Sequence, residues 1–301
     1  MTTINDQIPV SATVGTRRAV LRSKPKRLAI FGRPALYVAL AVWLIATLGP
    51  YVVMVLTSLT PESQLVASGA SVIPKTVSLQ GYIQLFTTTP FLSYLLNSLL
   101  TAAGTVIFAL IVSSAAAIAL SRFRFRGRTA MLSALLIAQL FPAVLMVIPL
   151  STMLQSAHLL DSKWGLILIY VTFASPFATY LLKGFLDGLP KELDEASTID
   201  GCSPFQMVRY ILLPLLRPGL TAAATYIFIF SWNEFLYALT FTSSTKSQTI
   251  PVGLQLFIGD YQIRWDLLTA GGVIAAIPVL VGFMLVQKHL IGGLAAGAVK
   301  G

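Results

Sequence analysis

Residues 195–214 read EASTIDGCSPFQMVRYILLP, a polar segment between two long apolar runs. Within it, Glu195 and Gly201 precede an Ile-x-Leu-Pro sequence that ends at Pro214. Helices surrounded by lipid need apolar side chains and have no use for such a pattern. We therefore predict that this segment is a structured surface that another molecule holds.

Composition places the rest of the chain in the membrane class. The 301 residues are 56% hydrophobic and 11% charged, with a mean hydropathy of +0.80, whereas soluble domains carry about 25% charged residues. A helix that crosses the hydrocarbon core needs about 20 apolar residues. Six stretches are long enough: 35–59, 91–120, 129–155, 164–186, 218–242 and 267–287. We expect an all-α integral membrane protein with six transmembrane helices over residues 34–301, after a basic tail, 1–33.

Basic residues are divided unequally between the loops. Six spans place both termini and the loops after the second and fourth spans on one side of the membrane. Seventeen of the 21 Lys and Arg residues lie on that side, and only Lys75, Lys163, Lys246 and Arg264 lie on the other. Cytoplasmic loops carry the excess of basic residues. The tail 1–33, both termini and the loop 187–217 are therefore predicted to be cytoplasmic.

Several function classes lack the residues they need. The net charge of +10 forms no continuous basic face, so no nucleic-acid partner is expected. Cys202 is the only cysteine, and His158 and His289 lie apart, so no disulfide and no metal site are expected. An integral-membrane enzyme would need a nucleophile with its base, or metal ligands, but the six stretches contain no His, no Cys and one acid, Glu234.

The loop 187–217 carries signals for two short helices. Pro190 and the acids that follow it favour a helix over 191–200. Gly201 suits the position after its end, because glycine accepts a positive φ. The sequence Ser203-Pro204-Phe205-Gln206 has the form of a capping box, so a second helix is expected to begin there.

The same loop resembles a motif of a known family. Glu195-Ala196-Ser197, Gly201 and the Ile-x-Leu-Pro sequence match the spacing of the EAA loop of ABC importer permeases at every fixed position. Ser197 stands where the family usually has alanine. Residues 120–123, 232–236 and 292–301 look like segments of the maltose-type carbohydrate permeases, and the likeness covers all but about the first 30 residues.

The resemblance implies a fold, a function and partners. It implies the type I ABC importer permease fold and a bacterial inner-membrane subunit that imports a carbohydrate. The partners would be two ATPase subunits, a second permease, an external solute-binding protein and membrane lipid. No cofactor is expected in this chain, which also lacks a G-x-x-x-x-G-K-[ST] phosphate loop, so the ATPase would bind ATP and magnesium. The implied coupling residues are Glu195, Ala196, Ser197, Asp200, Gly201, Ile211, Leu213 and Pro214.

Other solutes and another class of protein stay open at this point. The same machine could carry a polyamine, a phosphate ester or a peptide. A channel is a further alternative, but it would not explain a cytoplasmic loop hinged at a glycine.

Polar residues inside the apolar stretches are candidates for the substrate path. An acid in the bilayer is costly, by about 2.5–3.5 kcal/mol at its centre, and such residues are often functional. Glu234 could contact substrate or form an outer gate, or it could be a helix-end acid that faces water or a neighbouring subunit. The other candidates are Trp232, Asn233, Asn97 and Gln139; for the last two, hydrogen bonds between helices are the alternative.

Overall fold

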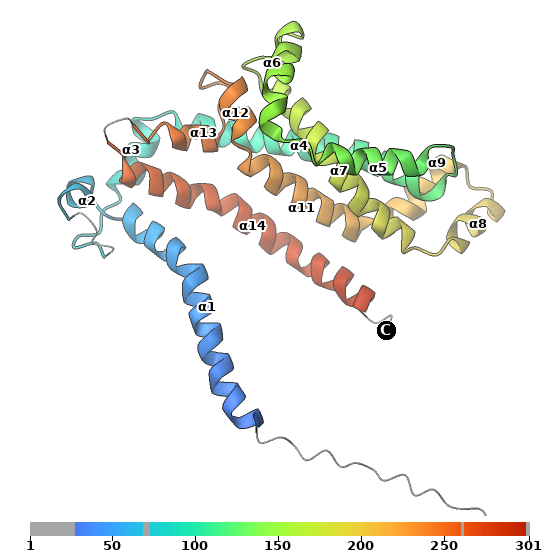
Figure 1. The fold of residues 1–301 in the computed structure, drawn as a ribbon, viewed down its shortest axis with the longest axis horizontal. Helices are drawn as coiled ribbons and strands as arrows, with labels where there is room; N and C mark the ends of the chain where they lie inside the picture. The colour runs from blue at the N-terminus through green and yellow to red at the C-terminus, as the bar shows by residue number, and fades with distance from the viewer. Residues whose placement is uncertain (1–27, 69–72, 260–261, 299–301) are drawn as a thin grey trace, which may run out of the picture. The chain divides into compact units, whose positions relative to one another are not determined.

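The computed structural model describes residues 28–68, 73–259 and 262–298 (Figure 1). Contacts divide the chain into two units, residues 1–50 and residues 51–301. Most of the expected basic tail, 1–27, lies outside the described residues. The regular secondary structure of the described residues consists of helices. These residues also form one isolated antiparallel bridge, between Ile258 and Ile263, and no strand.

Apolar composition and length decide which helices can cross a membrane. Four helices qualify alone, and up to six qualify if each of two bent pairs forms one span. The four are α1 from Pro34 onward, α4, α7 and α14. In chain order the elements are α1 (Leu28–Ser58), α2 (Glu62–Ser68), α3 (Gln80–Thr87), α4 (Phe91–Arg122), α5 (Arg128–Ala138), a 3₁₀ turn η1 (Ala143–Met146), α6 (Val147–Ser156), α7 (Lys163–Asp187), α8 (Glu192–Ile199), α9 (Pro204–Met207), a π-helical segment η2 (Val208–Leu212), α10 (Leu213–Leu215), α11 (Arg217–Asn233), α12 (Leu236–Phe241), α13 (Ile250–Gln255) and α14 (Trp265–Ala298).

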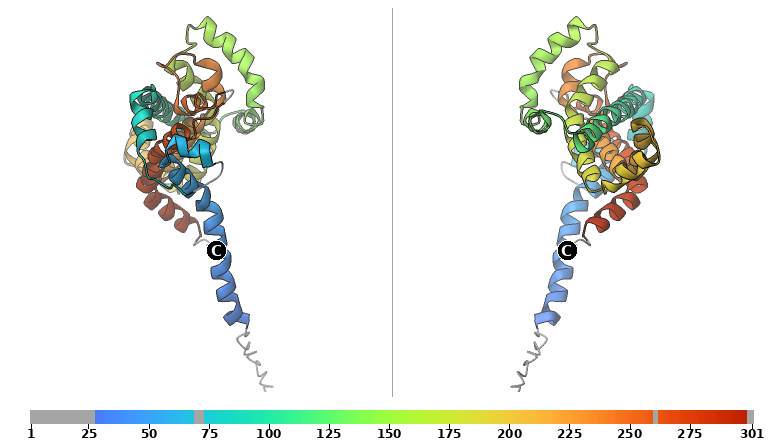
Figure 2. Two further views of the ribbon diagram at one scale, coloured as in Figure 1. Left: turned by 90° about the vertical axis from the view of Figure 1, so that its left-hand side faces the viewer. Right: turned by 90° about the vertical axis from the view of Figure 1, so that its right-hand side faces the viewer.

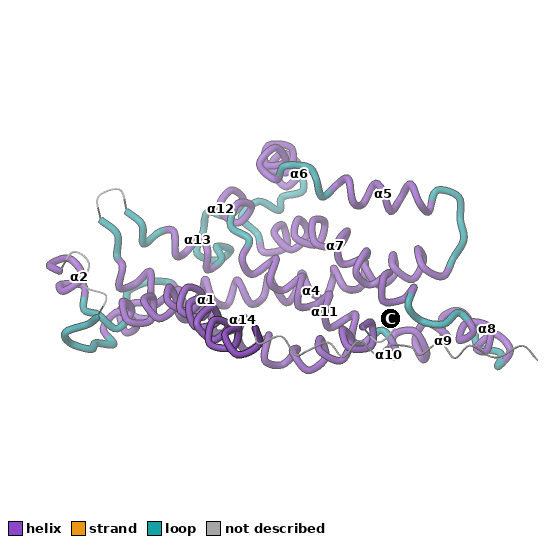
Figure 3. Tube along the Cα trace, turned by 60° about the horizontal axis from the view of Figure 1, so that its bottom comes forward, coloured by secondary structure: helices purple, strands orange, loops and turns teal. Residues whose placement is uncertain are grey.

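The third apolar stretch, expected as one helix over 129–155, is sharply bent. Its two helical parts, 128–138 and 143–156, make an angle of 97°. Pro142 lies at the bend with extended backbone, at φ −61° and ψ 123°, and proline disfavours helical geometry in the residue before it. Figures 2 and 3 show α6 turned across the direction of α5.

The fifth apolar stretch, expected over 218–242, is also divided. Helix α11 ends at Asn233, and Glu234 has extended backbone with φ −68° and ψ 124° before α12 begins. At its other end, α11 is bent by 74° from the segment 204–215. A proline at position 218 suits the first turn of α11, where no intrahelical N–H bond is needed.

Small side chains allow the helices of residues 51–301 to approach closely. Helix α7 packs along α4, and α11 lies against both (Figure 1). Their contact contains fully buried alanines on all three helices, at positions 109, 117, 174, 178 and 223. Ser113 of α4 lies in the same contact, and its Oγ donates a hydrogen bond to the Ser175 carbonyl of α7 at 3.2 Å. Such contacts are typical of helix pairs in membranes, because lipid supplies no hydrophobic drive between them.

Glycine packing on α7 gives a matched pair of substitutions. A Cβ at Gly165 would lie 2.3 Å from the Leu159 carbonyl oxygen, whereas a Cβ at Gly184 would have nothing within 4 Å. We expect Gly165→Ala to destabilise the chain by about 1–3 kcal/mol, as overpacking does. Gly184→Ala should stabilise it by up to about 1 kcal/mol through helix propensity. Unfolding midpoints of the two purified variants in detergent check this, and equal shifts would contradict it.

Candidate functional site

The polar loop forms two short helices joined by a tight turn at one end of the bundle (Figures 1 and 3). Helix α8 is followed by Gly201 at φ +78°, which confirms the expected glycine turn. The expected capping box is also present. The backbone N–H of Gln206 donates to Ser203 Oγ at 3.3 Å, and the backbone N–H of Ser203 donates to Gln206 Oε1 at 2.8 Å. Caps of this kind satisfy the free N–H groups at a helix start.

The end of α4 fastens this loop to the bundle. Arg122 Nε lies 3.3 Å from the Asp194 carboxylate of α8, and the arginine side chain is almost fully buried. Next to it, Ser121 Oγ donates to the Asp187 carboxylate at the end of α7, at 2.6 Å. Buried ion pairs fix position more reliably than exposed ones, because one charge left alone would be costly. Sequence reasoning missed both acids as positioning residues.

The structure separates the first five motif residues into two groups. Glu195, Ala196, Asp200 and Gly201 are exposed. Ser197, by contrast, is only 2% exposed. Its Oγ donates to the Asp194 carbonyl at 2.7 Å. The first group therefore offers a surface, and the serine belongs to the packing beneath it.

The three motif residues at the end of the loop are half-buried beside the bundle core. They are Ile211, Leu213 and Pro214. Between and after them, Leu212 and Leu216 are fully buried in the same cluster as Leu182 and Leu186 of α7. The second half of the loop therefore belongs to the same apolar cluster as α7.

Three large apolar side chains of the loop are exposed, and sequence reasoning missed them. Ile199 is 86% exposed, Phe205 73% and Tyr210 67%. The Arg209 guanidinium lies 5.9 Å from the centre of the Tyr210 ring. The sequence did offer a signal for them, because they are apolar residues in a polar loop whose short helices cannot bury them. Exposed apolar side chains mark an interaction site where they form one patch.

Glu234 caps the helix that follows it. Its carboxylate accepts hydrogen bonds from the Tyr170 hydroxyl at 2.7 Å and from the backbone amides of Tyr237 at 3.0 Å and Ala238 at 3.2 Å. Two of these donors are free N–H groups at the start of α12. The helix dipole also stabilises a negative charge at this position. The acid thus holds the broken fifth helix together, a structural role that its sequence position alone did not indicate.

The other four candidates for the substrate path have hydrogen-bond partners different from those of Glu234. Trp232 is buried and its Nε1 donates to the Ala275 carbonyl of α14 at 3.1 Å. Gln139 Nε2, at the bend after α5, donates to the Phe173 carbonyl at 2.9 Å. Asn97 donates to the carbonyls of Thr245 and Gln248 at 3.0 and 2.9 Å. Asn233 is exposed, as Gln139 is, and it donates within its own helix, to the Ile229 carbonyl at 2.8 Å.

A second polar cluster holds the segment 242–249. Asp161 accepts hydrogen bonds from the Ser243 and Ser244 amides at 2.9 and 3.0 Å and from the Ser247 hydroxyl. Lys163 Nζ donates to Asn97 Oδ1 at 3.2 Å and to the Lys246 carbonyl at 3.1 Å. Burial of Asp161 opposes its ionisation, but the hydrogen bonds outweigh burial and hold the pKa of its carboxyl below the ordinary value. Bonds to the charged form lower a carboxyl pKa.

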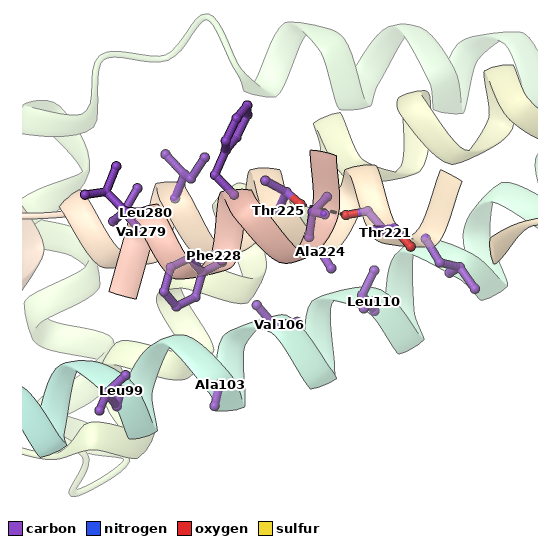
Figure 4. Close-up of a pocket in the computed structure, with 15 residues that line it drawn as sticks. Leu99, Ala103, Val106, Leu110, Thr221, Ala224, Thr225, Phe228, Val279 and Leu280 are labelled. Atoms are coloured by element: carbon purple, nitrogen blue, oxygen red, sulfur yellow. Dashed lines mark hydrogen bonds between the residues drawn. The ribbon is translucent and has the colours of Figure 1, made fainter. Parts of the chain in front are cut away.

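One cavity is apolar, and its lining contains none of these polar residues. It has a volume of about 710 Å³ and is bounded by α4, α11 and α14 (Figure 4). Thr221 and Thr225 are its polar lining residues. Another cavity, of about 530 Å³, is bordered by Trp232 and Asn233. Within the described ranges, no three His, Cys, Asp or Glu side chains come together as a possible metal site.

A family model and curated relatives match most of this chain. Residues 109–294 match the family described as "Binding-protein-dependent transport system inner membrane component". The sulfoquinovosyl glycerol transport system permease protein SmoH of Agrobacterium fabrum is 32% identical over 270 residues, which are 90% of this chain and 95% of that protein. The trehalose transport system permease protein SugB of Mycobacterium tuberculosis is 36% identical over 246 residues, 81% and 89% of the two chains.

Solved structures with the same fold come from an importer. One is a crystal structure of a bacterial ABC transporter involved in the import of the acidic polysaccharide alginate, with a TM-score of 0.77 and 21% identity. The match covers 87% of this chain and 97% of that chain. A second, of a bacterial alginate ABC transporter in complex with an alginate pentasaccharide-bound periplasmic protein, has a TM-score of 0.65 and 16% identity over 87% and 94% of the two chains.

The glutamate cap can be tested by its effect on stability. Glu234→Gln keeps the size of the side chain but leaves fewer acceptors, so we expect a loss of about 1.5–3 kcal/mol, the usual range for a hydrogen bond to a charged group. Tyr170→Phe removes one of the three donors and should cost about 1 kcal/mol. Thermal unfolding of the purified chain measures both.

Asn233→Ala is the matched control for this pair, because the exposed asparagine is adjacent and bonds only within α11. Its effect should stay within about 0.5 kcal/mol, as for other surface substitutions. An equal loss of stability in all three variants would contradict the capping role of Glu234.

Proposed function

The chain belongs to the family of inner membrane components of binding-protein-dependent transport systems, and from that premise we propose that it is the permease subunit of an ABC importer for a carbohydrate. An external binding protein delivers the solute, and separate ATPase subunits supply the energy. The carbohydrate assignment is supported by the relatives named for sulfoquinovosyl glycerol and trehalose and by the fold shared with an alginate importer.

The loop 187–217 is proposed as the joint with the ATPase. The observation that carries this role is the arrangement of the loop: exposed Glu195, Ala196, Asp200 and Gly201 stand on a base that is packed into the bundle. The exposed side chains of Ile199 and Phe205 enlarge the surface that a partner would cover. A groove of the ATPase that covers these apolar side chains and places a cation beside Glu195 would fit this surface. By excluding water, such a groove would strengthen the charge-assisted hydrogen bond to Glu195.

Movement of the joint reaches the membrane helices by two routes. The ion pair between Arg122 and Asp194 connects α8 to the end of α4. Buried Leu212 and Leu216 connect the second half of the loop to α7. Packed interiors transmit displacement instead of absorbing it. Closure of the ATPase pair would therefore tilt α4 and α7 and change which side of the membrane the path faces.

Topology and chemistry follow from the same proposal. The helices proposed to cross the membrane are α1, α4, the bent pair α5–α6, α7, the divided pair α11–α12, and α14. Both termini and the loop 187–217 face the cytoplasm, as the excess of basic residues favours. The chain carries no catalytic site and no cofactor of its own, and ATP with magnesium belongs to the ATPase.

The coupling role is tested by one acid and its neighbour. Glu195 and Glu192 are both exposed in the first turn of α8, and neither side chain bonds to another described residue. Glu195→Ala should reduce ATP hydrolysis stimulated by the loaded binding protein by about 10- to 150-fold, since a charge-assisted hydrogen bond contributes about 1.5–3 kcal/mol. Glu192→Ala removes the same charge and should leave stimulation within about twofold, as surface charges away from a contact do.

Stimulated ATP hydrolysis is measured for both variants in the assembled complex, and each rate is normalised to the amount of the chain inserted in the membrane. Phe205→Ser provides a second probe of the same surface, and it should weaken binding of the ATPase without unfolding the chain, because the phenyl ring is exposed. Equal stimulation in the Glu195→Ala and Glu192→Ala complexes would rule out Glu195 as a coupling residue.

We further propose that Asn233 and Glu234 border the solute path, while Trp232, Asn97 and Gln139 position its helices. Asn233 supports this because its exposed amide stands at the helix break, beside the cavity of about 530 Å³. Asn233→Ala should lower solute uptake at least several-fold with little loss of stability. Vesicles with the reconstituted complex measure uptake, and normal uptake would exclude Asn233 from the path.

A further inference from the structure

The connection between α4 and α5 is a short segment of alternating aromatic and basic residues. It reads Phe123-Arg124-Phe125-Arg126-Gly127. Its backbone is extended at Phe123, with φ −99° and ψ 140°. Gly127, at φ +92°, then turns the chain into α5. All four side chains before Gly127, two phenyl rings and two guanidinium groups, are exposed.

The two arginines of this segment have no carboxylate partner among the described residues. Arg122, just before the segment, is buried and pairs with Asp194. Arg124 and Arg126 are exposed and take part in none of the ion pairs or hydrogen bonds of the described chain. Their charge is therefore available to an anion outside the chain.

The two phenyl rings of the segment are also open to the surroundings. Phe123 is 49% exposed and Phe125 is 43% exposed. Phenyl rings left in water cost free energy, and they are stabilised where the chain meets apolar material. In a lipid layer, the acyl chains would surround the phenyl rings while the phosphates above them bind the arginines.

The connection is short and joins two candidate membrane spans, helix α4 and the pair α5–α6. A connection of five residues reaches at most about 17 Å even when it is fully extended. Because the chain must return into the membrane, the segment stays within about half of that distance of the helix ends. The polar layer on each side of a bilayer is about 5–7 Å thick, so a segment this close to two spans fits the depth of the lipid headgroups.

We propose that residues 123–127 form a binding site for an anionic phospholipid, in which Arg124 and Arg126 hold the phosphodiester of the headgroup. Phe123 and Phe125 pack on the upper acyl carbons of the same lipid layer. The neighbouring ion pair of Arg122 with Asp194 would then link the lipid site directly to helix α8. Charge and depth favour lipid over a protein partner, whose proposed contact lies on the more projecting loop α8–α9.

The site is tested in the full importer complex with a reporter in the segment. Phe125→Trp keeps an aromatic ring at this position and adds fluorescence that brominated lipid quenches at short range. The complex is placed in phosphatidylcholine bilayers that contain either brominated phosphatidylglycerol or brominated phosphatidylcholine. Fluorescence of the complex without the substitution is subtracted, because the chain has four native tryptophans. We expect brominated phosphatidylglycerol to quench the reporter at a much lower fraction of lipid.

Removal of both arginines should abolish this preference. A basic residue near an anionic membrane contributes about 1 kcal/mol, so Arg124→Gln with Arg126→Gln should lower the relative affinity for phosphatidylglycerol about 30-fold. Lys75→Gln with Lys246→Gln removes the same charge from exposed positions in other loops and should leave the preference unchanged.

Three results would overturn the proposal. The first is an unchanged preference after both arginines are replaced. The second is loss of quenching when soluble glycerol phosphate is added in excess, which would make the ligand a free anion. The third is reporter fluorescence that responds to removal of the ATPase subunits and not to lipid composition, which would make the segment a protein contact.

Discussion

The structure depends on one constraint, that every backbone N–H and C=O group inside a membrane must find a partner within the protein. Long helices satisfy it along most of the chain, and side chains satisfy it where the helices break. After α11, the Glu234 carboxylate accepts from the free amides that begin α12. After α5, Gln139 donates to the Phe173 carbonyl. Glu234, which we also propose as a border of the solute path, thus caps a broken helix, and Gln139 ties the bend after α5 to α7.

The polar loop is fastened at its base and open at its surface. Arg122 and Ser121, at the end of α4, hold acids of the loop and of α7. Leu212 and Leu216 are buried in the apolar cluster that α7 shares. The exposed groups are consequently presented at fixed positions, which a partner needs if it is to move the bundle and not merely bend a flexible loop. The same corner of the molecule contains the proposed lipid site.

Local structure of the loop was predictable from the sequence, and its contacts were not. The capping box at Ser203 and the positive φ of Gly201 involve residues at most three positions apart, so their chemistry is visible in the sequence. The partners of Arg122 and Glu234 lie up to 72 residues away in the chain. The lengths of the apolar runs likewise located the third and fifth stretches but did not indicate where these helices break. A proline or an acid interrupts a membrane helix only where neighbouring helices stabilise the broken form.

The sequence by itself determined the membrane class, the excess of basic residues on one side and the family motif from Glu195 to Pro214, because composition and fixed spacing are properties of the chain alone. Tertiary structure alone decided which motif residues are exposed, since burial depends on what α4 and α7 cover. It also decided that Glu234 is a cap and that Trp232, Asn97 and Gln139 bond to separate helices and loops, because hydrogen bonds between distant segments exist only once the helices have packed.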